Sequence, residues 1–210
     1  MDEALETYVL DHTGEEPELL RRLERDTKVR LLNGRMVSGR LQGRLLVMLC
    51  RMIKPRKILE LGTFTGYSAL CLAEGSAPDT EVHTIEHNDE LETTIQDWFA
   101  QSPYKNQLHL HIGEALEVLP TLEGPFDLVY LDLDKRAYLP CLQAVLPMVP
   151  SGGFILADNT LWGGKVLKPI APSDTQTLAI SEFNRYIATH SGLETVLLPL
   201  RDGLTLIRKK

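Results

Sequence analysis

Five polar side chains follow directly on two apolar segments in the second half of the chain. They are Asp132, Asp134, Lys135, Asp158 and Asn159. The segments, 126–131 and 153–157, predict buried parallel strands, whose carboxyl ends lie at one edge of a sheet. Asp132, Asp158 and Asn159 then form an all-oxygen set that suits Mg²⁺ above all, also Mn²⁺ or Ca²⁺, and is poor for zinc. Asp and Asn are common in turns after strands, but their presence at both strand ends favours a metal site.

A glycine turn between a short apolar strand and a helix indicates a second site nearby. Residues 58–70 read I-L-E-L-G-T-F-T-G-Y-S-A-L, the arrangement that binds small molecules beyond the strand ends of an open α/β sheet. A dinucleotide fingerprint needs a middle glycine where this chain has Phe64, between Gly62 and Gly66. The bulky side chain predicts a ligand with an adenosine end and no diphosphate. This points to S-adenosylmethionine rather than NAD.

Further polar residues fit the parts of such a ligand. Glu86 ends the next expected strand, where its carboxylate either accepts hydrogen bonds from ribose hydroxyls or favours a helix start. Ser68 either binds the carboxylate of the methionine moiety or caps the following helix. Glu60 is expected to meet the ammonium group, directly or through water. Residues 113–116 follow the third expected strand, where adenine would lie.

Strand and helix signals alternate after residue 55, which predicts a mainly parallel sheet with helices on both faces. The expected strands are 57–61, 81–86, 107–112, 126–131 and 153–157, and the expected helices are 66–75, 89–101, 114–119, 137–145 and 175–190. Two β-rich runs, 194–200 and 203–209, predict an antiparallel hairpin at the C-terminus. We expect a single domain over 1–210, with N-terminal helices over 1–54 and an α/β core over 55–210.

Composition and cysteine usage limit the class of protein. The 210 residues are 43% hydrophobic and 24% charged, as in ordinary globular domains. The acidic residues 1–6 lack the features of a signal peptide, and no apolar run approaches the ~20 residues that cross a bilayer. Cys50, Cys71 and Cys141 are widely spaced in apolar surroundings, which predicts buried free thiols. We therefore expect a cytoplasmic protein without a membrane segment.

The net charge of −7 is unevenly distributed. Residues 21–57 carry twelve Lys or Arg against Glu24 and Asp26, so this segment has a charge of +10 and the rest of the chain −17. The basic segment either forms solvated helix faces or binds an acidic substrate or RNA.

Six motifs span most of the chain in a defined order. They are M-V-S-G-R-L-Q-G (36–43), L-E-L-G-T-F-T-G-Y-S (59–68), I-E (85–86), L-D-L-D-K-R-A-Y (131–138), D-N-T-L-W-G-G (158–164) and D-G-L-T-L-I-R (202–208). In this order and spacing the chain resembles the cation-dependent O-methyltransferases, the family of catechol and caffeoyl-coenzyme A O-methyltransferases and their small bacterial relatives. The resemblance implies a Rossmann-like, seven-stranded class I methyltransferase sheet and a homodimer.

The resemblance also implies roles for individual residues. Contacts with S-adenosylmethionine are implied at Val37, Gly62, Phe64, Ser68, Glu86, Ala115 and Asp132. A divalent ion is implied on Asp132, Asp158 and Asn159. Lys135 matches the lysine regarded in the family as the general base, and with Asp132 it makes up the expected catalytic residues. The loop after Lys168 is short, so the substrate specificity of the plant enzymes does not transfer.

The implied reaction is methyl transfer from a sulfonium to a hydroxyl that lies next to another oxygen, as in a catechol. This in-line displacement needs orientation and activation of the nucleophile, which a chelating cation and a base at Lys135 supply. A small phenolic molecule is the preferred acceptor. The alternative is tRNA, methylated at 5-hydroxyuridine, which the basic segment favours because phosphate contacts need clustered Lys and Arg.

Four further residues each allow two interpretations. His109 and His111 either bind a metal or, as we favour, face solvent on an edge strand. Trp162 either walls an aromatic acceptor or packs in the core. Asp202 either lies near the acceptor or forms a D-G turn.

Overall fold

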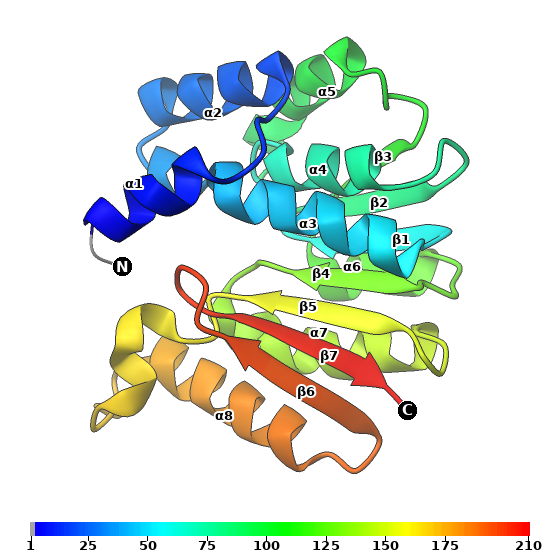
Figure 1. Cartoon of the computed structure of the whole chain (residues 1–210). Coiled ribbons are helices and arrows are strands. Elements are labelled where there is room, and N and C mark those ends of the chain that lie inside the picture. The colour runs from blue at the N-terminus through cyan, green and yellow to red at the C-terminus, as the bar shows by residue number, and fades with distance from the viewer. Residues whose placement is uncertain (1–2) are drawn as a thin grey trace.

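The computed structural model describes residues 3–210 as eight α-helices and seven strands around one sheet (Figure 1). The helices are α1 (Glu3–Asp11), α2 (Glu18–Arg30), α3 (Gly39–Ile53), α4 (Tyr67–Gly75), α5 (Glu92–Gln101), α6 (Ala115–Val118), α7 (Tyr138–Val145) and α8 (Thr175–Thr189). The strands are β1 (Lys57–Leu61), β2 (Glu81–Glu86), β3 (Leu108–Ile112), β4 (Leu128–Leu131), β5 (Phe154–Asp158), β6 (Leu193–Leu198) and β7 (Leu204–Lys209). Each expected strand is present, with its ends within two residues of the prediction.

The sheet has the strand order β3-β2-β1-β4-β5-β7-β6. Strands β1 to β5 pair in parallel, whereas β7 runs antiparallel to both β5 and β6. The parallel register places Leu61 opposite Leu131 and Leu131 opposite Ala157, so β1, β4 and β5 end side by side. This arrangement confirms the expected fold class, including the antiparallel C-terminal hairpin.

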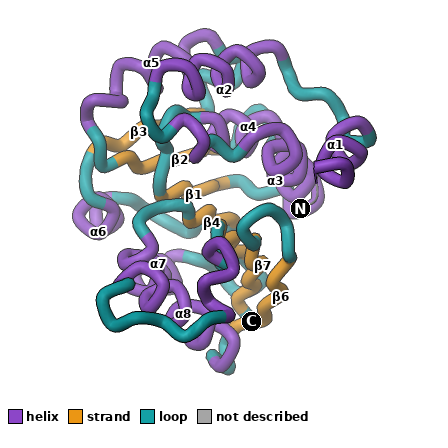
Figure 2. The backbone as a smooth tube through the Cα atoms, turned by 90° about the vertical axis from the view of Figure 1, so that its left-hand side faces the viewer, coloured by secondary structure: helices purple, strands orange, loops and turns teal. Residues whose placement is uncertain are grey.

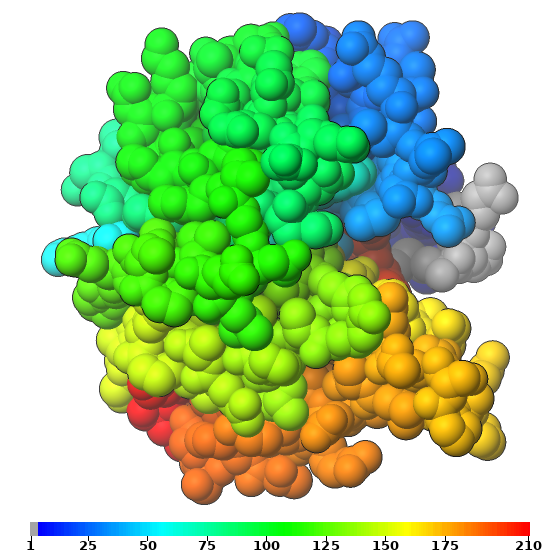
Figure 3. Space-filling view, turned by 180° about the vertical axis from the view of Figure 1, so that it is seen from behind, coloured from blue at the N-terminus to red at the C-terminus, as the bar shows by residue number. Residues whose placement is uncertain are grey.

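Helices cover both faces of the sheet, and strand residues alternate between the two cores. Even-numbered strand residues such as Ile58 and Leu128 pack with residues of α2, α3, α4 and α5. Odd-numbered residues such as Leu59 and Val129 pack with residues of α7 and α8. Figure 2 shows the two groups of helices on opposite sides of the strands. In the view from behind, the yellow-green and orange segments that contain α7 and α8 form the lower half of the surface (Figure 3). The sheet is therefore buried on both faces where the parallel strands end.

The N-terminal helices pack onto the α/β core mainly through the contact of α3 with α4, the first helix of that core. Leu46 and Val47 of α3 are buried, and burial of one such side chain contributes about 1.5–3 kcal/mol. Arg44 forms a two-pronged ion pair with Glu74 at the end of α4, with both N···O distances 2.6 Å. A Cβ on Gly43 would lie 2.9 Å from the Tyr67 ring, so the glycine allows the two helices to approach closely. Residues 39–53 are thereby held against the sheet.

Two expectations from composition are met within the described residues. All three cysteines are buried and free, as predicted. Among residues 3–210, no helix has both the length and the apolar character needed to cross a membrane.

Candidate active site

The predicted site residues gather where the order of the sheet reverses. Strands β2 and β3 lie on one side of β1 in the sheet, and β4 and β5 lie on the other side. Ligands of open α/β sheets bind at such a point, beyond the carboxyl ends of the strands. The turns after β1 and β4 meet here, because a Cβ on Gly62, whose φ is +101°, would lie 2.0 Å from the carbonyl oxygen of Asp132. Only glycine permits this approach.

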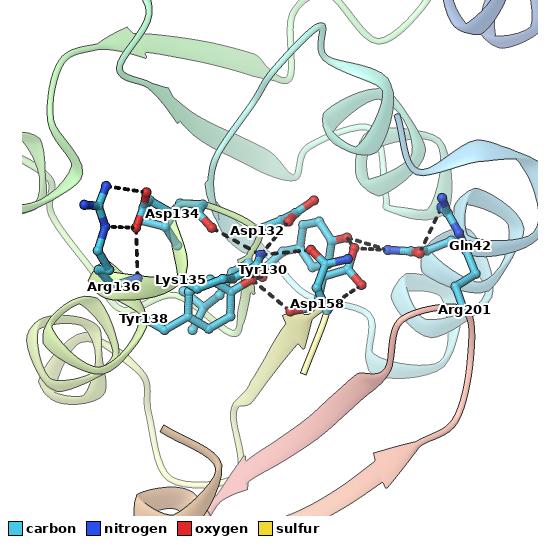
Figure 4. A network of polar contacts seen from close by, with 12 residues as sticks. Gln42, Tyr130, Asp132, Asp134, Lys135, Arg136, Tyr138, Asp158 and Arg201 are labelled. Atoms are coloured by element: carbon cyan, nitrogen blue, oxygen red, sulfur yellow. Dashed lines mark hydrogen bonds and ion pairs between the residues drawn. The ribbon is translucent and has the colours of Figure 1, made fainter. Parts of the chain in front are cut away.

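A buried amine lies between oxygens from the ends of β4 and β5 (Figure 4). Lys135 Nζ is 2.8 Å from Asn159 Oδ1 and 3.3 Å from Asp132 Oδ1. The Lys135 side chain is 5% exposed, so it is not a surface partner of these acids. Its amine marks a position where a cation is held by protein oxygens, and this donor set fits a hard divalent ion.

The second carboxylate, Asp158, is held by three donors and is 4% exposed. Its Oδ2 accepts hydrogen bonds from Tyr130 Oη at 3.0 Å and Gln42 Nε2 at 2.5 Å, and its Oδ1 accepts from the backbone N–H of Asn159 at 2.7 Å. The carboxylate comes from β5, whereas Tyr130 belongs to β4 and Gln42 to α3. Three separate elements therefore fix its orientation.

Tyr138 ties Lys135 to the two strand ends. Lys135 Nζ donates to Tyr138 Oη at 2.6 Å, and this hydroxyl lies 2.9 Å from the Asp158 carbonyl and 3.1 Å from that of Leu131. The sequence prediction did not single out Tyr138, although it lies in the motif 131–138. Asp134 takes no part in the cluster, because it caps the short helix η4 (Lys135–Ala137) and pairs with Arg136 instead.

The site has an excess of negative charge. Burial raises the pKa of the Asp132 carboxyl to about 6, the neighbouring Asp158 raises it further, and Lys135 opposes the rise. The Lys135 amine pairs with Asp132, whereas the neighbouring Asp158 carboxylate has hydrogen-bond donors but no ion pair with this amine among the described residues. Binding of a divalent cation would remove this repulsion.

Glu86 shapes the glycine turn after β1. Its Oε2 accepts a hydrogen bond from the Phe64 backbone N–H at 2.7 Å, and its Oε1 accepts from the Asn88 N–H at 2.9 Å. The φ of Phe64 is +52°, a left-handed value that is unfavourable for a bulky residue. The carboxylate at the end of β2 therefore holds the turn in its conformation, and the expected contact of Glu86 with ribose stays a prediction.

Glu60 carries an unpaired oxygen beneath this turn. Its side chain is fully buried, and Oε2 accepts a hydrogen bond from Thr84 Oγ1 at 2.5 Å, whereas Oε1 has no hydrogen-bond partner among residues 3–210. Burial raises the pKa of this carboxyl to about 8, although the hydroxyls of Ser68 and Thr84 act against the rise. Helix α4 takes Gly66 as its N-cap without a side-chain hydrogen bond, so Ser68 is not the cap. The orphaned oxygen fits a ligand with an ammonium group.

Two other predicted cofactor residues flank the turns. Val37 is 4% exposed and lies between the short helix η1 (Gly34–Met36) and α3. Arg201, in the loop between β6 and β7, donates to its carbonyl at 3.4 Å. Ala115 begins α6 directly after β3, as expected for the loop near adenine. Whether Val37 and Ala115 contact the cofactor stays a prediction.

Trp162 lies in the segment after β5, near Lys135, and Asp202 lies in the loop between β6 and β7. Trp162 is half-buried, and Lys135 Nζ lies 5.7 Å from its ring centre. Its Nε1 finds no hydrogen-bond partner in the part of the chain that the structure describes. Asp202 Oδ1 accepts a hydrogen bond from the Gly163 N–H and so joins the β6–β7 loop to the segment after β5. The indole lies near Lys135 and also packs against the core on the α7 and α8 side of the sheet. Whether Trp162 and Asp202 lie against an acceptor stays a prediction.

His109 and His111 lie on β3, the edge strand, as expected. His109 is exposed, and His111 Nε2 lies 3.0 Å from Nδ1 of His83 on the neighbouring strand. Between residues 3 and 210, no three His, Cys, Asp or Glu side chains are arranged to hold a metal. The candidate cation site instead combines two carboxylates with an amide oxygen.

Strained backbone is concentrated at the site. Five non-glycine residues in the described range have positive φ, and four of them border the site: Phe64, Asn159, Trp162 and Arg201. Such conformations cost about 1–3 kcal/mol each and persist where surrounding contacts enforce them, commonly at functional sites.

Comparison with known proteins identifies the family. The sequence profile of a family described as O-methyltransferase matches residues 10–210. The chain is 33% identical to the O-methyltransferase ankF of Aspergillus thermomutatus over 190 residues, 83% of this chain and 80% of that protein. It is 30% identical to a caffeoyl-CoA O-methyltransferase of Eucalyptus gunnii, over 99% of this chain and 88% of that protein. The crystal structure of the O-methyltransferase TomG from Streptomyces achromogenes, in complex with S-adenosylmethionine, has a TM-score of 0.90 and 28% identity, covering 99% and 96% of the two chains.

The seven-stranded sheet and its flanking helices define a class I methyltransferase fold. The chain belongs to the O-methyltransferase family. The family and the enzyme class expected from the sequence are thereby confirmed.

Proposed function

We propose that the protein transfers the methyl group of S-adenosylmethionine to a hydroxyl of a small phenolic molecule that carries a neighbouring oxygen, with a divalent cation. The observation that carries the proposal is the buried Lys135 amine, 2.8 Å from the Asn159 amide oxygen and 3.3 Å from Asp132. The glycine turn that is expected to hold the methyl donor lies directly beside it, since Gly62 contacts the backbone of Asp132.

The methyl donor is expected to lie over the turns after β1 and β2. When bound, it supplies an electrophilic methyl group on a positively charged sulfur. Glu60 has a free oxygen for its ammonium group, and Ser68 lies beside Glu60 for its carboxylate. Glu86 retains acceptor capacity for the ribose hydroxyls, since each of its oxygens takes one backbone N–H.

Asp132, Asp158 and Asn159 are the residues that would hold the cation. When bound, a divalent ion lowers the pKa of an acceptor hydroxyl and orients its two oxygens. Magnesium is the first candidate, because all three ligands are hard oxygens. Lys135, whose amine is buried beside Asp132 and Asn159, is proposed as the base that accepts the proton of the hydroxyl.

The indole of Trp162 supports an aromatic acceptor. Its ring centre lies 5.7 Å from Lys135 Nζ, and its buried Nε1 has no hydrogen-bond partner within the described residues. A flat phenolic ring would stack against this surface. The relatives named as caffeoyl-CoA O-methyltransferases favour an acceptor of this kind.

The contacts of the basic segment weaken the case for tRNA. Of its twelve Lys and Arg residues, five pair with carboxylates: Arg21, Lys28, Arg30, Arg44 and Lys57. Paired charges contribute less to phosphate binding than free ones. We therefore propose the small molecule as substrate and keep tRNA as an outcome of the test.

The experiment offers both acceptors to one enzyme preparation. The protein is incubated with radiolabelled S-adenosylmethionine and Mg²⁺, with caffeic acid in one tube and tRNA lacking the modification in another. An Asp158→Ala variant and EDTA serve as controls. Label in caffeic acid alone supports the proposal, and label in tRNA alone would replace it with the tRNA function. Label in neither, while the donor still binds, would contradict both acceptor assignments.

We further propose a single functional domain over 1–210 and a cytoplasmic homodimer. The exposed apolar side chains Val29, Leu32 and Met36, all within eight residues of the chain, support self-association, since exposed apolar surface can mark interaction sites. The three free buried cysteines agree with a reducing compartment. A monomeric mass by light scattering would contradict the dimer, and recovery in a membrane or secreted fraction would contradict the location.

A further inference from the structure

A buried amide connects the outer rim of the site to Asp158. Gln42 is 1% exposed and lies in α3, in a part of the chain 116 residues before the acid. Its Nε2 is 2.5 Å from Asp158 Oδ2 and 2.7 Å from Tyr130 Oη, and its Oε1 is 3.3 Å from Nη1 of Arg201 (Figure 4). The Gln42 side chain thus contacts the Asp158 carboxylate, the hydroxyl of Tyr130 in β4, and Arg201 in the loop between β6 and β7.

The orientation of the Gln42 amide follows from these partners. An arginine has only donors, so the atom that faces Arg201 must be the amide oxygen. The NH₂ group then faces Asp158, which in its ionised form has only acceptors. Arg201 is itself held by the backbone carbonyl of Val37. Arg201 and Asp158 therefore together determine which way round the Gln42 amide lies.

The contact with Gln42 restrains the Asp158 side chain. A buried carboxylate without donors is strongly unfavourable, and Asp158 takes donors from Gln42 and Tyr130 on one oxygen. The backbone N–H of Asn159 occupies the other oxygen. Removal of the Gln42 amide would leave one fewer donor to set the rotation of the carboxylate, while Tyr130 would still keep the group buried.

We propose that Gln42 is a positioning residue for Asp158, and that it sets the affinity of the site for a divalent cation without touching the cation. This inference rests on the proposed function, in which Asp158 is a ligand. Side chains that orient metal ligands change metal affinity by about 10–100-fold when they are replaced. The expected effect of losing the amide is of this size.

The test compares two buried glutamines. Gln42→Met keeps the size of the side chain and removes its hydrogen bonds, and Gln42→Glu keeps the acceptor for Arg201 but removes the donor to Asp158. Gln107→Met is the matched control, because Gln107 is also buried, at 8% exposure, and lies before β3 away from the strand ends that form the site. The dissociation constant of Mn²⁺ is measured by electron paramagnetic resonance of the free ion, without donor or acceptor.

We expect the wild type and Gln107→Met to bind Mn²⁺ equally, and both Gln42 variants to bind it at least 10-fold more weakly. Affinity for S-adenosylmethionine should change less than affinity for Mn²⁺, because Gln42 contacts Asp158 directly and reaches the predicted donor residue Val37 only through Arg201. In turnover, saturating Mg²⁺ should restore kcat while the KM for Mg²⁺ stays raised, which a general loss of structure would not produce. Thermal melting identifies a variant that fails to fold, and the other Gln42 variant then decides.

Two failures are distinguishable. If wild-type protein binds no Mn²⁺, or binds it as well as Asp158→Ala does, the cation site of the proposed function is wrong and this inference falls with it. If the wild type binds Mn²⁺ through Asp158, but a folded Gln42 variant binds it within twofold of the wild type, only the role of Gln42 is overturned.

Discussion

Lys135 Nζ lies 2.8 Å from Asn159 Oδ1, although 24 residues separate them in the chain. The parallel pairing of β4 and β5, with Leu131 opposite Ala157, brings the two residues together just beyond the sheet. Tyr138 fixes the amine at this position through a hydrogen bond of 2.6 Å.

Replacement of Lys135 by Met should strongly reduce turnover while donor binding persists. A positioned base contributes about 10²–10⁴-fold to the rate, so kcat should fall by this factor. The measurement is methyl transfer to a phenolic acceptor, with the donor affinity determined by calorimetry. Lys105→Met, at an exposed lysine in another part of the chain, is the control. A Lys135→Met enzyme with kcat within threefold of the wild type would exclude Lys135 as the base.

The stability of the unliganded protein should depend on pH through Glu60. Its pKa is raised from 4.5 to about 8, so the folded state holds this proton more tightly than the unfolded state. The stabilisation is present below pH 4.5 and is lost as the pH rises to about 8. Glu60→Gln cannot lose a proton there. We expect its melting temperature, relative to that of the wild type, to increase between pH 5 and pH 9, and a constant difference would refute this.

Glu86 should contribute to donor binding through the conformation of the Phe64 turn. Its carboxylate accepts the Phe64 N–H at 2.7 Å, and hydrogen bonds to charged groups contribute about 1.5–3 kcal/mol. Glu86→Gln should therefore weaken binding of S-adenosylmethionine by about 10–150-fold in calorimetry. The exposed Glu90 offers the control, Glu90→Gln, which should bind normally. Equal affinities of the two variants would contradict this role for Glu86.

Trp162 should affect the acceptor and not the donor. Loss of an aromatic wall removes about 1.5–3 kcal/mol of apolar contact, so Trp162→Ala should raise the KM of a phenolic acceptor about 10-fold or more. Trp162→Phe should lie between the variant and the wild type, since it keeps an aromatic face. Steady-state kinetics with each substrate varied in turn provides the measurement. A rise in the donor KM alone would place the indole elsewhere.

The sequence predicted the strands well because their signals are local. Each buried strand is a short apolar run, and the residues that follow β4 and β5 need only the parallel register to meet. Asp132, Lys135, Asp158 and Asn159 were therefore found together. The glycine turn was equally predictable, because Gly62 and Gly66 adopt positive φ values that other residues rarely take.

Side-chain partners from distant elements could not be predicted in this way. Nothing in the local pattern of α3 shows that Gln42 meets Asp158, because the contact depends on how the helix packs on the sheet. Tyr130 lies within an apolar run, which indicates a buried strand but gives no sign of the contacts of its hydroxyl with Asp158 and Gln42. Asp134 is close in sequence to the predicted metal ligand Asp132. Its carboxylate instead forms an ion pair with Arg136, which the sequence does not indicate.

The most direct measurement is the dependence of methyl transfer on a divalent cation. Wild-type protein and Asp158→Asn are treated with EDTA, dialysed, and assayed with labelled S-adenosylmethionine and caffeic acid over a range of Mg²⁺ concentrations. We expect the wild type to lose its activity with EDTA and regain it with Mg²⁺, and the variant to remain inactive or to need far more Mg²⁺. Full activity of the wild type after removal of metal, or equal Mg²⁺ dependence of the two proteins, would contradict a cation site at Asp132, Asp158 and Asn159.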